Sequence, residues 1–120
     1  MVVRAVRGAT ALSADDRDEM VEAVVELLGE LLQRNSLTTD DLVSIVFTAT
    51  PDLHSEFPAA AARTFGLGDV PLLCAQELAI AGAMPRVVRV MAHVNTDRAR
   101  DEIQHVYLRG TETLRSDLAQ

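Results

Sequence analysis

The side chains of this chain with the clearest capacity for chemistry are arginines, which make up all 11 of its basic residues. Arg89 stands out because it lies inside residues 86–96, a stretch rich in β-branched residues that neither Gly nor Pro interrupts. A guanidinium keeps its charge in a protein, so Arg89 needs an anionic or hydrogen-bonding partner there. That partner is either a carboxylate of the chain itself or an anionic ligand.

A small set of further residues could complete a site around Arg89. These candidates lie on other predicted elements of the chain and are Arg7, Arg63, Glu77, Tyr107 and Arg115. Glu77 is the best-placed acid, because it directly follows a predicted strand. Periodicity alone makes an internal Arg89–Glu77 ion pair the default arrangement, and an anion site built from several arginines is the alternative. The pattern leaves both open.

Other kinds of active site find little support in the sequence. His54, His93 and His105 lie on different predicted elements and lack the spacing of metal ligands. Cys74 has no recognisable base or oxyanion hole nearby, and a free cysteine is often only a small buried hydrophobe. Neither a Gly-rich phosphate loop nor a GxSxG motif is present. We therefore expect no metal centre and no nucleophilic catalysis.

Composition limits the class of protein. A length of 120 residues predicts a single domain, residues 1–120, with a core of aliphatic side chains, since aromatic residues make up only 3%. The formal charge of −7 argues against nucleic acid as a partner. No apolar run reaches the roughly 20 residues of a membrane span, and residues 1–10 lack the apolar core of a signal peptide. With one cysteine, which excludes an internal disulfide, we expect a cytoplasmic protein.

Periodic patterns predict five strands and two helices. Strands are expected at residues 2–7 (ended by Gly8), 42–48, 70–76, 86–96 and 103–108. A helix with Ser13 as its N-cap continues to about Arg34, with apolar residues every three or four positions, and a short helix covers residues 57–65. Residues 110–120 are only weakly patterned and are expected to form a partly mobile tail. The predicted class is a mixed α/β sheet.

The strand sequences also bear on assembly. Several strands are apolar on both faces, for example at Ile45 and Val46 or at Leu72 and Leu73. Two helices can cover only one face of such a sheet. We therefore expect other copies of the chain to cover the second face.

Several short strings resemble one known family. In chain order they are RGAT at residues 7–10, TATPDLH at 48–54, FP at 57–58, Cys74 and Glu77 three apart, RVVRVMAHVNT at 86–96 and HVYL at 105–108. Together they are similar to the monofunctional chorismate mutases of the trimeric α/β type, which are distinct from the all-helical chorismate mutases. The likeness runs from residue 3 to residue 118, without large insertions.

The resemblance implies a fold, an assembly and a reaction. The fold would be a mixed sheet with two helices, in a homotrimer whose pseudo-barrel carries three active sites at subunit clefts. The reaction would be the rearrangement of chorismate to prephenate, in phenylalanine and tyrosine biosynthesis, with no cofactor, metal or covalent intermediate. The alternative is a non-catalytic trimeric module that binds a metabolite in the same anion cleft.

The resemblance also implies roles for individual residues. Arg89 would stabilise the charge that develops on the ether oxygen of the substrate. Glu77 and Cys74 would contact its ring hydroxyl. Arg7 and Tyr107 would hold a carboxylate. The remaining substrate-binding residues would be Phe57, Arg63, Leu73, Cys74, Ala75, Gln76, Leu114 and Arg115. Leu73 stands where the family often has a small polar residue, so its contact would be apolar here.

Overall fold

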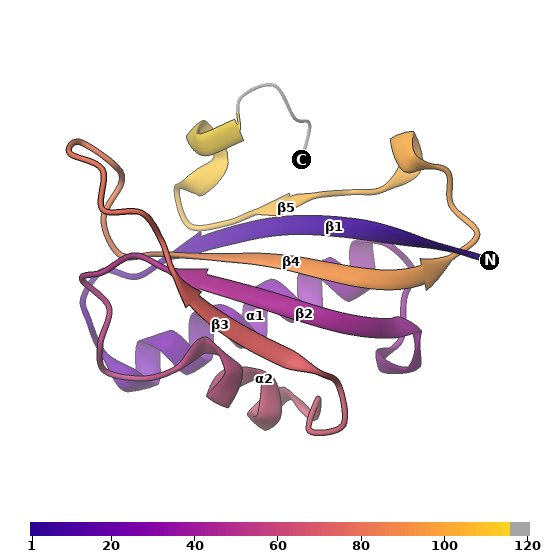
Figure 1. Cartoon of the computed structure of the whole chain (residues 1–120), viewed down its shortest axis with the longest axis horizontal. Helices are drawn as coiled ribbons and strands as arrows, with labels where there is room; N and C mark the ends of the chain where they lie inside the picture. Colours follow the sequence, from indigo (N-terminus) through magenta and orange to yellow (C-terminus); the bar gives the residue numbers. More distant parts are fainter. Residues whose placement is uncertain (116–120) are drawn as a thin grey trace.

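A five-stranded mixed sheet with two helices on one of its faces forms the architecture of the chain (Figure 1). The computed structural model describes the backbone of residues 1–115 and the side chains of residues 1–114. The strands are β1 (Val2–Ala11), β2 (Leu42–Ala49), β3 (Leu72–Gln76), β4 (Val87–Thr96) and β5 (Val106–Tyr107), and the helices are α1 (Arg17–Arg34) and α2 (Pro58–Phe65). This confirms the predicted α/β class with its five strands and two helices.

Strand β4 occupies the centre of the sheet, whose order is β3-β2-β4-β1-β5. It pairs antiparallel with both β1 and β2 over most of its length. One set of alternate side chains is buried against the helices, at Val88, Val90, Ala92 and Val94. Arg89 belongs to the opposite set and therefore points away from the helices. The position predicted for Arg89, in the middle of a central strand, is confirmed.

Helix α1 supplies most of the core beneath the sheet. Its apolar side recurs at the predicted positions, and the buried residues include Met20, Val24, Leu27, Leu28 and Leu31. The predicted N-cap was wrong: the helix begins after Asp16, whose side chain accepts a hydrogen bond of 2.8 Å from the backbone N–H of Glu19. Ser13 instead donates its own backbone N–H to the Glu19 carboxylate, over 2.6 Å. Several good capping residues lie in a row here, and only the path of the chain decides which of them caps the helix.

Strand β1 does not end at Gly8, as the sequence suggested, but continues to Ala11. Glycine is required at this position for a different reason than a turn. A Cβ atom there would lie 2.8 Å from the carbonyl oxygen of Val106 in β5 and 3.1 Å from Cγ1 of Val90. Gly8 therefore allows β5 to approach β1 closely, which places Tyr107 beside Ala9.

Within one chain the helices cover only one face of β2 and β3, and the expectation that other copies of the chain cover the second face stays a prediction. In β2 only the helix-facing side chains, Ile45 and Phe47, are fully buried, and β3 is an edge strand in which Leu73 is 63% exposed. The last strand is shorter than predicted, because only Val106–Tyr107 pair with β1. A 3-10 turn at residues 100–102 lies ahead of it. A final 3-10 turn, Thr111–Arg115, follows, and the rest of the predicted tail lies outside the described residues.

The face of the sheet opposite the helices, which we call the open face, has no layer of α-helices over it within the described chain (Figure 1). Part of it is covered by Met84 and Leu114, which pack against the buried cluster of Ala9, Val87 and Tyr107. Apolar side chains are exposed on it, including Val3, Leu73 and Met91. None of the helices in the described part of the chain combines the length and apolarity that crossing a membrane would require.

Candidate active site

A row of paired residues crosses the open face at the position of Arg89. In the register of the sheet, Arg89 of β4 lies opposite Thr48 of β2 and opposite Ala9 of β1. The row is extended by Ala75 of β3, which pairs with Thr48, and by Tyr107 of β5, which pairs with Ala9. Side chains directly opposite on one face of a sheet are close enough to interact. Pairing of all five strands thus gathers residues that are far apart in sequence.

Arg89 and Glu77 form the predicted ion pair, in which Arg89 Nε lies 3.2 Å from Glu77 Oε1. The other carboxylate oxygen, Oε2, accepts a hydrogen bond from the hydroxyl of Thr48. The backbone of Glu77 is fixed as well, because its N–H donates to the carbonyl of Ala49 over 2.9 Å. Both groups remain partly accessible, with side-chain exposures of 41% for Arg89 and 22% for Glu77. The pair is therefore held in place without being sealed from solvent.

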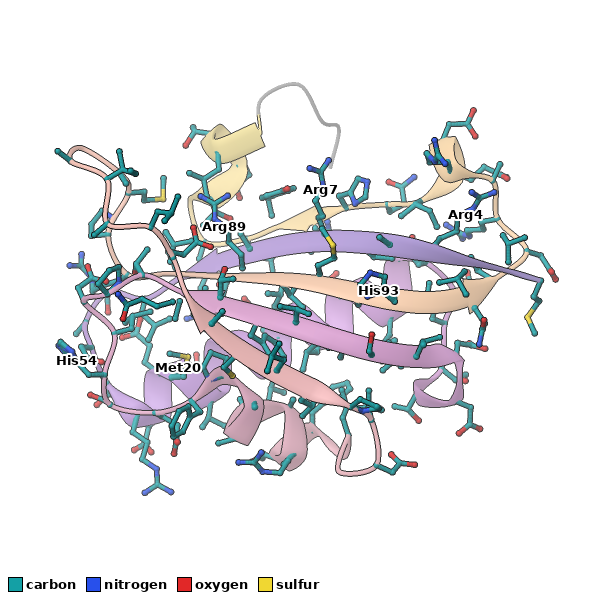
Figure 2. The ribbon with its side chains drawn as sticks, viewed as in Figure 1. Arg4, Arg7, Met20, His54, Arg89 and His93 are labelled. Atoms are coloured by element: carbon teal, nitrogen blue, oxygen red, sulfur yellow. The ribbon has the colours of Figure 1, made fainter. Side chains whose placement is uncertain are left out.

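A cavity of about 320 Å³ lies directly beside this pair. We call it the arginine pocket, and its polar lining consists of Arg7, Thr48, Glu77, Arg89 and Tyr107. Figure 2 shows Arg7 and Arg89 on the neighbouring strands β1 and β4, far from His54 in the loop at the edge of the molecule. The two arrangements that the sequence left open therefore coexist: the ion pair forms, and an open pocket lies next to it.

The arginine pocket has an excess of positive charge. Arg7 forms no ion pair with any carboxylate of residues 1–114, so two guanidinium groups face the single carboxylate of Glu77. The backbone N–H of Arg7 donates to Nδ1 of His105 over 3.0 Å, which ties this part of β1 to the segment before β5. The pocket is suited to an anionic ligand, since uncompensated guanidinium groups bind carboxylates well.

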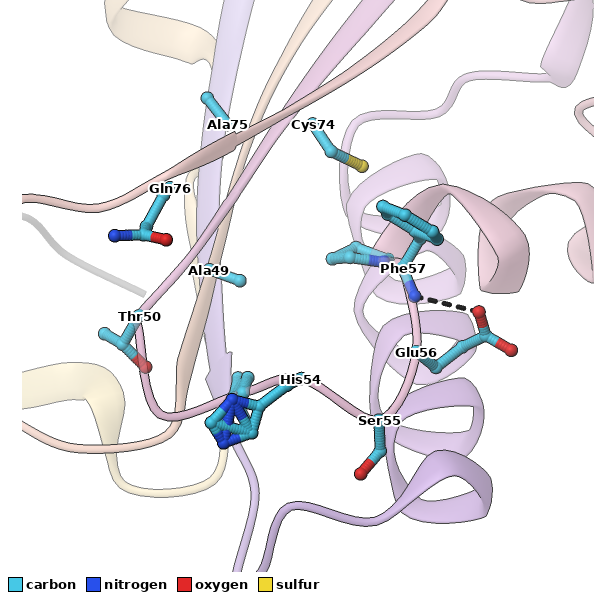
Figure 3. Close-up of a pocket in the computed structure, with 11 residues that line it drawn as sticks. Ala49, Thr50, His54, Ser55, Glu56, Phe57, Cys74, Ala75 and Gln76 are labelled. Carbon is cyan, nitrogen blue, oxygen red and sulfur yellow. Dashed lines mark hydrogen bonds between the residues drawn. The ribbon is translucent and has the colours of Figure 1, made fainter.

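A second hollow also lies at the C-terminal end of β3, lined by the residues just before Glu77, and we call it the loop pocket (Figure 3). Its cavity of about 330 Å³ is lined by the loop before α2 and by three residues of β3, namely Cys74, Ala75 and Gln76. Figure 3 shows the side chains of Cys74 and Phe57 pointing toward one another inside it. The Phe57 side chain is 67% exposed, which is unusual for a large aromatic residue and leaves its ring free to contact a ligand or another chain.

The predicted site residues thus fall into two groups within one chain. Arg7, Glu77, Arg89 and Tyr107 line the arginine pocket, whereas Phe57, Cys74, Ala75 and Gln76 line the loop pocket. Leu114 packs against Ala9, Val87 and Tyr107, next to the first group. The structure brings neither Arg63, which is exposed on α2, nor Leu73, exposed on β3, into either pocket, and the Arg115 side chain lies outside the described part.

Asp15 anchors the loop that carries Phe57. Its Oδ1 atom accepts hydrogen bonds of 3.0 Å from the backbone N–H groups of both His54 and Ser55, and its backbone carbonyl accepts one from the Ser55 hydroxyl. Partial desolvation raises the pKa of Asp15, but the hydrogen bonds from His54 and Ser55 together outweigh it, so the pKa lies below its usual value of 3.8. The ionised form of Asp15 therefore holds the loop.

We expect acid to loosen this loop. A carboxyl whose pKa is lowered by folding stabilises the folded state above its unfolded pKa, and this contribution disappears as the pH falls through the lower, folded value. Between about pH 5 and pH 3 the wild-type protein should thus lose more thermal stability than Asp15→Asn, which has no charge to titrate. Melting temperatures of both proteins across that range test the expectation, and parallel curves would contradict it.

Five residues that line the arginine pocket were not predicted from the sequence: Gly8, Val46, Thr48, Val90 and Met91. Thr48 begins one of the strings that carried the family resemblance, yet it received no role. Its signal was present in the alternation of β2, where Ser44, Val46 and Thr48 share a face opposite Ile45 and Phe47. A polar side chain on the same face as Arg89 and in the neighbouring strand is a signal for a site residue.

Three comparisons with known proteins agree with one another. The sequence model of the family described as chorismate mutase type I matches residues 3–118. The chain is 44% identical over 118 residues to the chorismate mutase AroH of Thermus thermophilus, covering 98% of this chain and 97% of the relative. It is 39% identical over 120 residues to AroH of Bacillus subtilis strain 168, covering 99% and 94%.

A solved structure is similar over nearly the same span. A chorismate mutase from Clostridium thermocellum superposes with a TM-score of 0.90 at 44% sequence identity, covering 92% of this chain and 98% of that one. The similarity therefore extends to the arrangement of the strands that carry both pockets.

Proposed function

Because the chain belongs to the chorismate mutase type I family and is accordingly a chorismate mutase, an isomerase, we propose that the arginine pocket is where chorismate rearranges to prephenate. The observation that carries this proposal is the pair of guanidinium groups, Arg7 and Arg89, around a cavity that holds only one carboxylate. The substrate is a dianion, so the net positive charge of this pocket attracts it. A non-catalytic binding module would not explain the family to which the chain belongs.

Arg89 acts on the transition state. In the rearrangement the ether C–O bond of the substrate breaks while a C–C bond forms within the same molecule, and negative charge gathers on the ether oxygen. A fixed cationic donor at that oxygen stabilises the transition state more than the ground state, and only such a difference accelerates the reaction. Arg89 fits this role because it projects from the central strand, where pairing on both sides limits its movement.

Other groups of the pocket hold the substrate in its reactive shape. Arg7 and Tyr107 bind a carboxylate of the substrate from the β1–β5 side of the pocket. Glu77, on the β3 side, accepts a hydrogen bond from the ring hydroxyl of the substrate. Contacts at both ends of a flexible substrate favour the compact conformer in which the two reacting carbons meet. The required chemistry is thus orientation and electrostatics, supplied by side chains of the chain itself.

The active unit we propose is a homotrimer with one site at each subunit boundary. Support comes from the partly apolar open face, which no α-helix covers within the described chain, and from the division of the site residues between two separate pockets. In a trimer, Phe57 and Cys74 of one subunit would face the arginine pocket of the next, and Arg63 and Arg115 would add positive charge. We propose further that the whole chain is one domain and, with its single free cysteine, works in the cytoplasm.

The purified protein should consume chorismate, seen as a loss of its ultraviolet absorbance, without any added metal or cofactor. Sedimentation should give about three times the chain mass of 13.0 kDa, and activity per chain should fall once dilution dissociates the trimer. Unchanged chorismate after prolonged incubation would contradict the function. A fully active monomer would contradict only the proposal that each active site is built by two neighbouring subunits.

A further inference from the structure

Thr48 makes a contact that the proposed chemistry has not yet used. Its hydroxyl donates to Oε2 of Glu77, while the other oxygen of the same carboxylate, Oε1, lies 3.2 Å from Arg89 Nε. Thr48 is the cross-strand partner of Arg89 on the open face, and it also lines the arginine pocket. Side chains from β2 and β4 therefore meet at one carboxylate, that of the residue directly after β3.

The contact with Thr48 prevents the Glu77 carboxylate from forming a bidentate pair with Arg89. A free carboxylate tends to form a bidentate pair with a guanidinium, which occupies two of its nitrogen donors. Here Oε2 is engaged by the Thr48 hydroxyl, and Glu77 contacts the guanidinium through Oε1, at Nε. Within the described part of the chain, Nε of Arg89 is buried and makes no hydrogen bond, because its N–H is not aimed well enough at Oε1 of Glu77 to form one.

Threonine is well suited to hold the carboxylate in this way. Its branching at Cβ restricts the first side-chain torsion, so the hydroxyl keeps one direction on the strand. The flanking residue Phe47 is completely buried, and the backbone of Thr48 is paired on one side with Arg89 and on the other with Ala75. The donor that reaches Glu77 therefore stands on one of the best-fixed positions in the sheet.

We propose that Thr48 is a positioning residue for the mutase reaction, which by engaging Oε2 of Glu77 keeps the terminal nitrogens of Arg89 free and aimed at the substrate. This inference rests on the proposed function of the arginine pocket and deepens it. Thr48 acts through Glu77 and need not touch the substrate. Without its hydroxyl, the Glu77 carboxylate can rotate and close on Arg89.

The experiment compares steady-state kinetics of Thr48→Val, Thr48→Ser and the wild type. Valine keeps the shape of threonine but has no donor, so kcat should fall by about tenfold to a hundredfold, the range expected for losing a hydrogen bond to a charged group. KM should change little, because the Thr48 hydroxyl orients Arg89 toward the transition state and does not itself bind the substrate. Serine retains the hydroxyl and should restore most of kcat.

A double-mutant cycle separates this role from a structural one. When Glu77 is already replaced in Glu77→Ala, adding Thr48→Val should cost nothing more, because Thr48 acts only through that carboxylate. An equal loss of kcat in both backgrounds, or a wild-type kcat for Thr48→Val, would overturn the inference. If the valine variant does not fold, as its melting temperature would show, the same cycle is run with Thr48→Ala.

Ser44→Ala provides the matched control. Ser44 lies on the same strand and the same face as Thr48, and its hydroxyl contacts Nδ1 of His93 at 3.3 Å instead of the arginine pocket. Its removal should leave kcat unchanged, whereas a loss equal to that of Thr48→Val would overturn a specific role for Thr48. A wild-type protein that fails to convert chorismate would reject the proposed function itself. An active wild type with an equally active Thr48→Val would reject this inference alone.

Discussion

Replacing Arg89 with lysine should lower kcat for chorismate by roughly a hundredfold to a thousandfold, the usual cost of losing a donor aimed at developing negative charge. Lysine keeps the positive charge but carries it on a single ammonium group, which cannot contact Glu77 and the ether oxygen with separate, fixed donors. KM should rise much less than kcat falls, because the ether oxygen carries its extra charge only in the transition state. Initial rates of chorismate disappearance measure both constants.

Arg34→Lys is a fair control for this substitution. Arg34 is also ion-paired, with Nε 2.9 Å from Oε2 of Glu30, but it lies at the end of α1 on the helical side of the sheet. Its replacement should leave kcat and KM as they are. An Arg89→Lys protein that kept most of its turnover would show that charge alone suffices, and the role assigned to the directed guanidinium donors would be wrong.

Truncating Phe47 to alanine should cost about 3–5 kcal/mol in the free energy of unfolding, the range measured for buried phenylalanines. Phe47 is 0% exposed and is the largest of the fully buried side chains of the described residues, in a chain that has only three phenylalanines. The cavity left behind would lie beneath β2, directly under the strand that carries Thr48. Urea unfolding followed by circular dichroism gives the difference.

Phe57→Ala makes the same chemical change at a side chain that is 67% exposed. Its effect on the stability of the folded chain should stay within about 0.5 kcal/mol, as for most surface substitutions. Because Phe57 belongs to the proposed site, we expect this variant to lose activity while it keeps its fold. Equal destabilisation by the two substitutions would show that the loop pocket is buried in the working protein more fully than a single chain suggests.

Local sequence patterns were enough to predict the scaffold of the site. The β-branched stretch around Arg89 predicted a central strand, because a strand paired on both sides needs side chains that fit a pleated, buried surface. Likewise, apolar residues every three or four positions predicted α1 and its buried side. The association of Arg89 with Glu77 was also predicted correctly, although the sequence could not show whether an open cavity would remain beside it.

The fold class and the central strand could be predicted from sequence alone, since they follow from periodicity over a few neighbouring residues. The residue types available for chemistry could be read there directly. Three features became visible only in the folded chain: Thr48 engages Glu77, Gly8 allows β5 to approach β1, and the site residues divide between two pockets. Those outcomes depend on register and close approach between strands distant in the chain. A change of register by one residue would turn Arg89 toward the core, and the burial of one face that prevents this exists only once the strands and helices have come together.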